Sequence, residues 1–248
     1  MKKVLLCEPN VSEGQDHEIV DQILAAIQET PGVKVIDYSA DAAHNRAVFT
    51  YLGDPEAVLD ATQRMTGRAF ELIDMRHHQG AHPRMGAVDV VPFVPVRGIE
   101  PDEAIEIARR YGRFVGGKGV PVYYYEQAAT RPERHSLPDI RKGEYEGLSA
   151  KLKEPEWRPD EGPAEFNPKT GALVTGVRFP LIAFNVNLWT QDLSIAERIA
   201  RAVRHISGGY RYVRAIGLEL EDKGQVQVSM NLVNYTKTPI HRVLETVR

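Results

Sequence analysis

Two strand-like stretches follow each other in this chain with no helix between them, and this feature limits the folds available to it. The stretches are "GVKVIDYSA" (residues 32–40) and "NRAVFTYLG" (residues 45–53), with a polar turn between them. Successive parallel strands need a long crossover, so such a pair argues against a purely parallel sheet. No G-x-G-x-x-G motif follows the first strand-like stretch, residues 2–9, which also argues against a Rossmann fold.

The remaining periodicity up to residue 126 completes a β-α-β-β-α-β-α-β order. Helical spacing and capping residues predict helices, and β-branched runs predict strands. The predicted helices span residues 16–30, 54–74 and 101–117, and the further strands span residues 87–96 and 120–126. Pro92 and Pro95 predict an edge position or a bulge for the strand that contains them. The first six elements match the ferredoxin-like split β-α-β order.

Residues 127–177 are rich in proline and show little periodicity, which predicts a long functional loop and linker. After it, the β-α-β-β-α pattern recurs, with strands over 178–190, 212–221 and 225–235 and helices over 194–206 and 238–248. We therefore predict an α+β fold of two ferredoxin-like subdomains, residues 1–177 and 178–248, with mixed β-sheets and helices packed on them. The second subdomain is expected to be incomplete, because its pattern stops in mid-helix.

Composition narrows the class of protein. The formal net charge of −3 gives no basic surface for nucleic acid. The single cysteine, Cys7, excludes a disulfide framework and is expected to be a small core residue. The apolar run Val4–Cys7 is too short for a signal peptide, and no segment approaches the length of a membrane span. These features predict a cytoplasmic enzyme or binding protein.

The stretch "HHQGAHPRMGAVDVVPFVPVRG" (residues 77–98) holds three histidines within six positions. Together with Asp89 they could supply metal ligands, but Gly80 and Pro83 break any helix that would place two of them at i and i+4. We therefore predict no metal. The first two histidines, His77 and His78, are expected to cap the preceding helix.

His82 lies between two glycines in an irregular segment, where backbone can approach a ligand closely. A free histidine titrates near pH ~6.5 and can accept a proton at neutral pH. A structural role, with the His82 ring hydrogen-bonded within the turn, is an equally good interpretation. The stretch is therefore compatible with a catalytic base but does not indicate which reaction it would serve.

Six stretches of the chain resemble the formiminotransferase domain of glutamate formimidoyltransferase, the family that includes the bifunctional formiminotransferase-cyclodeaminases. They run in order along nearly the whole chain: "PNVSEG" (9–14), "NRAVFT" (45–50), "LIDMRHHQGAHPRMGAVDVVPFVPVRG" (72–98), "LPDIRKGEYEGL" (137–148), "LIAFNVNL" (181–188) and "QVSMNL" (227–232). The resemblance implies transfer of a formimino group from formiminoglutamate to tetrahydrofolate, the co-substrate, in histidine degradation and one-carbon metabolism.

The resemblance also assigns roles to residues. His82 corresponds to the catalytic base, and the folate-contacting segment corresponds to Gly162, Pro163, Ala164, Glu165, Phe166, Asn167, Pro168, Lys169, Thr170 and Gly171. It implies two subdomains with a substrate tunnel between them and a homodimer. A separate cyclodeaminase chain is a candidate partner, since the sequence contains no segment that resembles a cyclodeaminase domain. The chain departs from the family at Ser39, where the vertebrate enzymes carry an acidic residue, and in ending several tens of residues earlier.

The reaction needs a group that moves protons and groups that bind carboxylates. One imidazole can take a proton from the attacking amine and return it to the leaving nitrogen, with no metal or redox step. Arg46, Arg84 and Lys169 are candidate partners for substrate carboxylates, with structural salt bridges as the alternative. Asn10 either orients a substrate or caps the next helix. A folate-binding protein without turnover and a relative acting on formyl-folates are the competing hypotheses.

Overall fold

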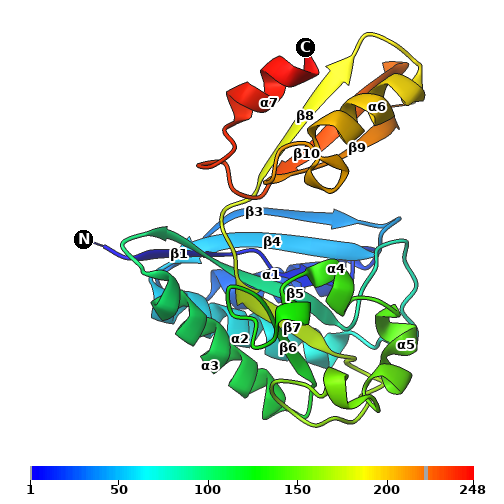
Figure 1. Cartoon of the computed structure of the whole chain (residues 1–248). Helices are drawn as coiled ribbons and strands as arrows, with labels where there is room; N and C mark the ends of the chain where they lie inside the picture. The colour runs from blue at the N-terminus through cyan, green and yellow to red at the C-terminus, as the bar shows by residue number, and fades with distance from the viewer. Residues whose placement is uncertain (1, 221–222) are drawn as a thin grey trace. The chain divides into compact units, whose positions relative to one another are not determined.

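The computed structural model describes residues 2–220 and 223–248. The chain divides into two compact units, residues 1–178 and 179–248, and each has its own sheet (Figure 1). The fold is α+β, as predicted. The division falls one residue beyond the boundary predicted from the sequence.

The first unit is built on a mixed seven-stranded sheet. Its strands are β1 (Val4–Cys7), β2 (Asn10–Val11), β3 (Val33–Asp41), β4 (Arg46–Gly53), β5 (Val88–Arg97), β6 (Val122–Glu126) and β7 (Leu173–Val177). Its helices are α1 (His17–Gln28), α2 (Pro55–Leu72), α3 (Pro101–Gly116), α4 (Leu137–Ile140) and α5 (Glu144–Lys151). Single 3-10 turns lie at Pro132–Arg134 and Pro155–Trp157.

The strands of this sheet run in the order β3, β4, β1 with β2, β5, β7, β6. β1 and β2 both pair with β4 on one side and β5 on the other, so they act as one strand that is interrupted in the middle. All pairs from β3 to β5 are antiparallel, and β5, β7 and β6 are parallel. The antiparallel part is consistent with the predicted split β-α-β order, and two parallel strands extend it.

β5 shows how the sheet accommodates two prolines. The predicted edge position is wrong, because β5 has neighbours on both sides. The predicted bulge is confirmed twice: the pairing with β1 skips Val96, and the pairing with β2 skips Asp89. Pro92, which has no N–H to donate, lies opposite the interruption between β1 and β2.

β7 is the strand that the sequence patterns missed. Residues 127–177 were predicted as loop and linker, but Leu173–Val177 are all buried and lie between β5 and β6. A parallel strand that is covered on both faces is apolar throughout, so it lacks the alternation of polar and apolar residues that predicts a strand. Because the preceding residues are rich in proline, the short apolar run of β7 was assigned to the same loop.

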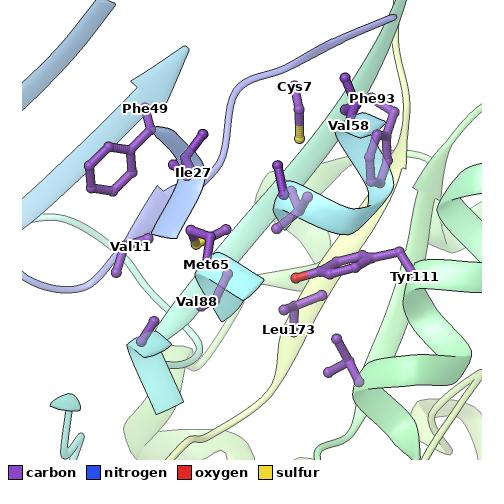
Figure 2. Packing of buried hydrophobic residues seen from close by; sticks show 14 of the residues in the cluster. Cys7, Val11, Ile27, Phe49, Val58, Met65, Val88, Phe93, Tyr111 and Leu173 are labelled. Atoms are coloured by element: carbon purple, nitrogen blue, oxygen red, sulfur yellow. The ribbon is translucent and has the colours of Figure 1, made fainter. Parts of the chain in front are cut away.

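The two faces of the sheet are covered differently. Helices α1, α2 and α3 pack on one face, where Cys7, Phe93, Tyr111 and Leu173 form part of a buried cluster (Figure 2). Cys7 is fully buried there, as expected, and burial raises the pKa of its thiol to about 12. The thiol is therefore a core group.

On the opposite face, α4 and α5 pack over β5, β6 and β7. Val174 alternates with Leu173 and contacts this second cluster together with Leu148. Alternate side chains of β4 on the same face, including Arg46 and Val48, remain only half-buried. This partly open region of the face is where the predicted site residues gather.

The second unit repeats the predicted β-α-β-β-α order. Its elements are β8 (Ile182–Leu188), α6 (Leu193–Val203), β9 (Val213–Leu220), β10 (Gln225–Leu232) and α7 (Ile240–Val247), with a 3-10 turn at His205–Ser207. The sheet is antiparallel in the order β8, β10, β9, and α6 and α7 complete a separate core. The predicted end of β9 at residue 221 lies outside the described residues. Within the part of the chain described, no helix combines the length and apolar character that a membrane crossing requires.

Candidate functional site

Asn45 joins three of the motifs singled out in the sequence. Its side chain accepts a hydrogen bond from the backbone N–H of Gly14 (2.9 Å) and donates one to the carbonyl of Gln79 (2.8 Å). The residue is buried and has a φ of 46°, a conformation that asparagine tolerates better than most residues. The "PNVSEG" loop, the start of β4 and the histidine stretch therefore meet at one side chain.

Glycines allow this close approach. A Cβ on Gly14 would lie 2.5 Å from the backbone N of Arg46, and one on Gly80 would lie 2.4 Å from the carbonyl oxygen of His44. The N–H of Ala81 also donates to the carbonyl of Ala43 (3.3 Å). The turn that carries His82 is thus held against the β3–β4 turn by backbone contacts.

His78 has a role different from the predicted helix cap, and that prediction is wrong. Helix α2 ends at Leu72, and the His78 ring lies against Asn45 and Arg84 instead. Its Nδ1 accepts a hydrogen bond from Arg84 Nε (3.2 Å), so its Nε2 donates to the Asn45 carbonyl (2.9 Å). Burial lowers its pKa, which keeps the ring neutral. His77 is exposed in the turn that follows α2.

Arg84 is buried and forms ion pairs with Glu144 (3.2 Å) and Glu146 (2.6 Å) in the first turn of α5. This is the structural salt bridge that the sequence left open as an alternative to substrate binding. Because both carboxylates and His78 occupy its guanidinium, Arg84 fixes the histidine turn to α5.

His82 is half-buried in the irregular segment between Gly80 and β5. Among the described residues, none forms a hydrogen bond with its ring. Burial, together with the positive charges of Arg46 and Arg141 and smaller effects from His44 and Arg84, lowers its pKa to about 4. The imidazole is therefore neutral at pH 7 and can accept a proton.

The predicted folate segment, residues 162–171, ends in a tight turn. Asn167 Oδ1 accepts hydrogen bonds from the N–H groups of Lys169 (3.1 Å) and Thr170 (3.2 Å). Gly171 follows with a φ of 69°, and its N–H donates to the carbonyl of Asn167 (2.7 Å). These hydrogen bonds fix the backbone of the second half of the segment.

The same turn pairs with the chain just after His82. The N–H of Ala87 donates to the carbonyl of Thr170 (2.9 Å), and the N–H of Ala172 donates to the carbonyl of Met85 (3.0 Å). A Cβ on Gly171 would lie 2.2 Å from that Met85 carbonyl oxygen. The structure thus brings the predicted folate segment and the predicted base within a few residues of each other.

Phe166 and Lys169 have partners inside the protein. The Phe166 ring lies 5.3 Å from that of Tyr145 and packs against the second buried cluster. Lys169 Nζ donates to the carbonyl of Glu71 (3.1 Å). Gly162, Ala164, Glu165 and Pro168 are exposed, and Pro163 is half-buried.

A cavity of about 660 Å³ opens beside these elements. It is lined by residues 75–76 and 78–80, by Arg84 and by residues 143–146 at the start of α5. The turn that holds His78 therefore forms one wall of a hollow large enough for a small molecule.

Asn10 and Asp89 lie in the strands beneath the site. Asn10 is half-buried in β2 and does not cap the next helix, since Asp16 caps α1 through the N–H groups of Glu18 and Ile19. Asp89 accepts a hydrogen bond from the N–H of Met85 (2.9 Å) and pairs with Arg141, so it is not free as a metal ligand. The described residues contain no group of three or more His, Cys, Asp or Glu side chains that could hold a metal ion.

Arg141 is a further charged residue beside His82, and the sequence did not indicate it. It follows α4 within "LPDIRKGEYEGL", and its side chain is 14% exposed. The available signal was Asp89, a carboxylate within the apolar run "AVDVVPF", because a buried carboxylate requires a cationic partner.

Comparison with known proteins identifies the family. A family model for the N-terminal subdomain of the formiminotransferase domain matches residues 4–178, and a model for the formiminotransferase domain matches residues 183–248. The chain belongs to the formiminotransferase domain family.

Relatives of this formiminotransferase domain cover its whole length. It is 45% identical to a glutamate formimidoyltransferase of Streptococcus pyogenes serotype M1, over 100% of this chain and 83% of the relative. It is 44% identical to a glutamate formimidoyltransferase of Thermoplasma acidophilum, over 98% of this chain and 80% of the relative. A formimidoyltransferase-cyclodeaminase of Rattus norvegicus is 46% identical over 100% of this chain, which spans 47% of that longer protein.

Proposed function

We propose that this protein is a glutamate formimidoyltransferase, which transfers a formimino group from N-formimino-L-glutamate to tetrahydrofolate. The observation that carries the proposal is the 45% identity to a glutamate formimidoyltransferase along the entire chain. The geometry supports it, because His82 is neutral, free of hydrogen bonds to described residues and close to the segment that resembles a folate site.

His82 acts as general base and then as general acid in this proposal. A secondary amine of the reduced folate attacks the formimino carbon, a C–N bond forms, and the C=N electron pair moves to the imino nitrogen. The attacking nitrogen then loses its proton to His82, and His82 returns a proton to the glutamate nitrogen. The electron pair on the imino nitrogen then re-forms the C=N bond, the C–N bond to the glutamate nitrogen breaks, and glutamate leaves with the proton. No electron is gained or lost overall.

Residues 162–171 contact the folate in this proposal, with Phe166 as the candidate for stacking on the pterin ring. Asn10 and Arg46, on the partly open face of the sheet, are the further candidates for substrate contact. In this proposal the protein is a cytoplasmic homodimer. The two-activity name of the rat relative fits a cyclodeaminase as a partner of this domain.

A turnover assay tests the proposal. Purified protein is incubated with formiminoglutamate and tetrahydrofolate, and release of glutamate is measured. Binding of tetrahydrofolate without turnover would favour the alternative of a folate-binding protein. Turnover with formylated but not formiminated donors would instead identify a relative that acts on formyl-folates.

A further inference from the structure

Three buried polar atoms have no hydrogen-bond partner among the described residues: Arg46 Nε, Arg141 Nε and Thr170 Oγ1. Arg46 and Arg141 are the two charged residues with the largest effect on His82, and Thr170 pairs with the chain five residues after it. Thr170 is only 7% exposed. Buried polar groups are nearly always bonded, because leaving one unpaired costs roughly 1–3 kcal/mol. Such atoms in one neighbourhood therefore point to a polar ligand as their partner. The other unpartnered buried atoms belong to Arg134, whose guanidinium pairs with Asp160 (2.7 Å).

The strand register brings Arg46 to this neighbourhood. Ala47 and Val88 both lie opposite Val11 of β2, so Arg46 begins β4 alongside residues 86–87 of the neighbouring segment. Roughly 10 Å, two interstrand spacings, separate the two backbones. Ala47 is buried against α1–α3, so the Arg46 side chain points to the opposite face, which α4 and α5 partly cover.

Arg141 and Thr170 approach the same residues from the other side. Arg141 pairs with Asp89, the bulged residue of β5, and Thr170 accepts the N–H of Ala87 through its carbonyl. His82 lies in the segment immediately before β5. Four residues from separate parts of the chain therefore lie around the start of one strand.

The charges of this group do not balance. Arg141 is neutralised by Asp89, but the Arg46 side chain forms no ion pair or hydrogen bond with any residue in 2–220 and 223–248. Asp41, the other carboxylate that acts on Arg46, pairs with His44 (3.0 Å). One positive charge therefore remains without a direct partner on the protein, which favours an anionic ligand.

We propose that Arg46, Arg141 and the Thr170 hydroxyl form an anion site beside His82 that binds the α-carboxylate of the formimino donor. This assignment rests on the proposed function and specifies where its first substrate binds. The carboxylate oxygens accept hydrogen bonds from the two guanidinium groups and from the hydroxyl. The three buried atoms thereby gain the partner that they lack.

Chemistry selects the donor over the folate as the source of this anion. The formimino nitrogen of the donor is attached to the carbon that bears the α-carboxylate, so an anion site next to the base places the reacting carbon beside it. The carboxylates of tetrahydrofolate lie at the far end of the molecule from its reactive amine, beyond the aminobenzoyl group. A folate with its amine at His82 cannot place a carboxylate at Arg46.

Steady-state kinetics of Arg46→Gln and Thr170→Val test the site. Neither change leaves a buried partner unpaired, so both proteins are expected to unfold at or above the wild-type midpoint. The Michaelis constant for formiminoglutamate is expected to rise about 10- to 100-fold for Arg46→Gln, which loses a charge-assisted contact, and less for Thr170→Val. The constant for tetrahydrofolate should change less than about twofold in both. Arg46→Lys keeps the charge and should be intermediate.

Arg113→Gln is the matched control, since Arg113 lies exposed on α3 and pairs with Glu106. Calorimetric titration with L-glutamate, the expected product, measures the site without turnover and should show weaker binding to Arg46→Gln. The anion site is overturned, and the reaction stands, if the wild-type protein is active and Arg46→Gln leaves the Michaelis constant for formiminoglutamate unchanged. The same conclusion follows if Arg46→Gln raises the Michaelis constants for formiminoglutamate and tetrahydrofolate equally. Loss of glutamate binding in Arg46→Gln, in a protein that transfers no formimino group, supports the site and refutes the reaction.

Discussion

The histidines at 77, 78 and 82 have identical side chains and three different environments. His77 is exposed, His78 is fixed by hydrogen bonds to Asn45 and Arg84, and His82 is half-buried with a ring that no described residue bonds. Only the last combines partial burial with a ring nitrogen that no described residue bonds. The environment, not the residue type, distinguishes the candidate base.

Replacing that imidazole should remove catalysis and leave the fold intact. We expect His82→Ala to lower kcat about 10²- to 10⁴-fold, the usual contribution of a general acid–base group, with Michaelis constants within a few-fold of wild type. His77→Ala is the control and should keep wild-type turnover. Equal rates for His82→Ala and wild type, at equal thermal midpoints, would exclude His82 as the base.

The low pKa of His82 predicts an unusual acid limit for activity. Because the folded pKa, about 4, lies below the ordinary value of 6.5, the ring loses its base function only as the pH falls toward 4. The free enzyme should therefore show an acid limb in kcat/KM well below pH 6.5. The free energy of unfolding should depend on pH in the same direction. The contribution of His82 to it is complete above pH 6.5 and declines as the pH falls through 4. NMR titration of His82 measures the value directly, and a pKa at or above 6.5 would refute it.

The pH profile of kcat should differ from that of kcat/KM. The charges that lower the His82 pKa come from Arg46, Arg141, His44 and Arg84, and a bound carboxylate between the first two would offset them. The pKa of His82 should then rise in the complex, so the acid limb of kcat should lie at higher pH. Coincident acid limbs in the two profiles would argue against a carboxylate at this position.

At the scale of elements, the pairing of residues 85–87 with 170–172 connects the base to the folate segment. Gly171→Ala should disrupt it, because the alanine would need a left-handed backbone and its Cβ would lie 2.2 Å from the Met85 carbonyl oxygen. We expect a loss of at least about 2 kcal/mol in the free energy of unfolding and weaker tetrahydrofolate binding.

Gly67→Ala provides the comparison, since it lies inside α2 with open space around the added methyl group. It should stabilise the protein by about 1 kcal/mol, as alanine favours a helix. Urea unfolding measures both changes. Equal effects of the two substitutions would show that the Gly171 turn has no special backbone requirement.

Local patterns predicted most elements because their signals are local. Asp54 and Pro55 mark the start of α2 in the sequence and in the structure, and the strand-like residues 45–53 predict β4. The missed features depend on distant residues instead. β7 acquires its place only from β5 and β6, and Arg141 acquires its role only from Asp89. The sequence therefore indicated the motif of the candidate site but not all of the charged residues around it.

At the scale of the whole molecule, each unit has its own buried core, and the first also requires its last strand. A fragment of residues 1–178 should therefore unfold cooperatively in urea, whereas a fragment of residues 1–170 should not. Without β7, the facing edges of β5 and β6 are unpaired, and such edges promote aggregation. A hydrophobic dye should bind to the fragment of residues 1–170 and not to the fragment of residues 1–178. Cooperative unfolding of both fragments would contradict this expectation.

The inner position of β7 also affects synthesis on the ribosome. β5 and β6 emerge before the strand that joins them, and the 51 residues from 127 to 177 take roughly 3 to 10 s to translate at usual rates. For those seconds the unpaired edges of β5 and β6 are exposed in the nascent chain, and a chaperone can bind such a chain. Codon usage across this interval therefore bears on the yield of native protein.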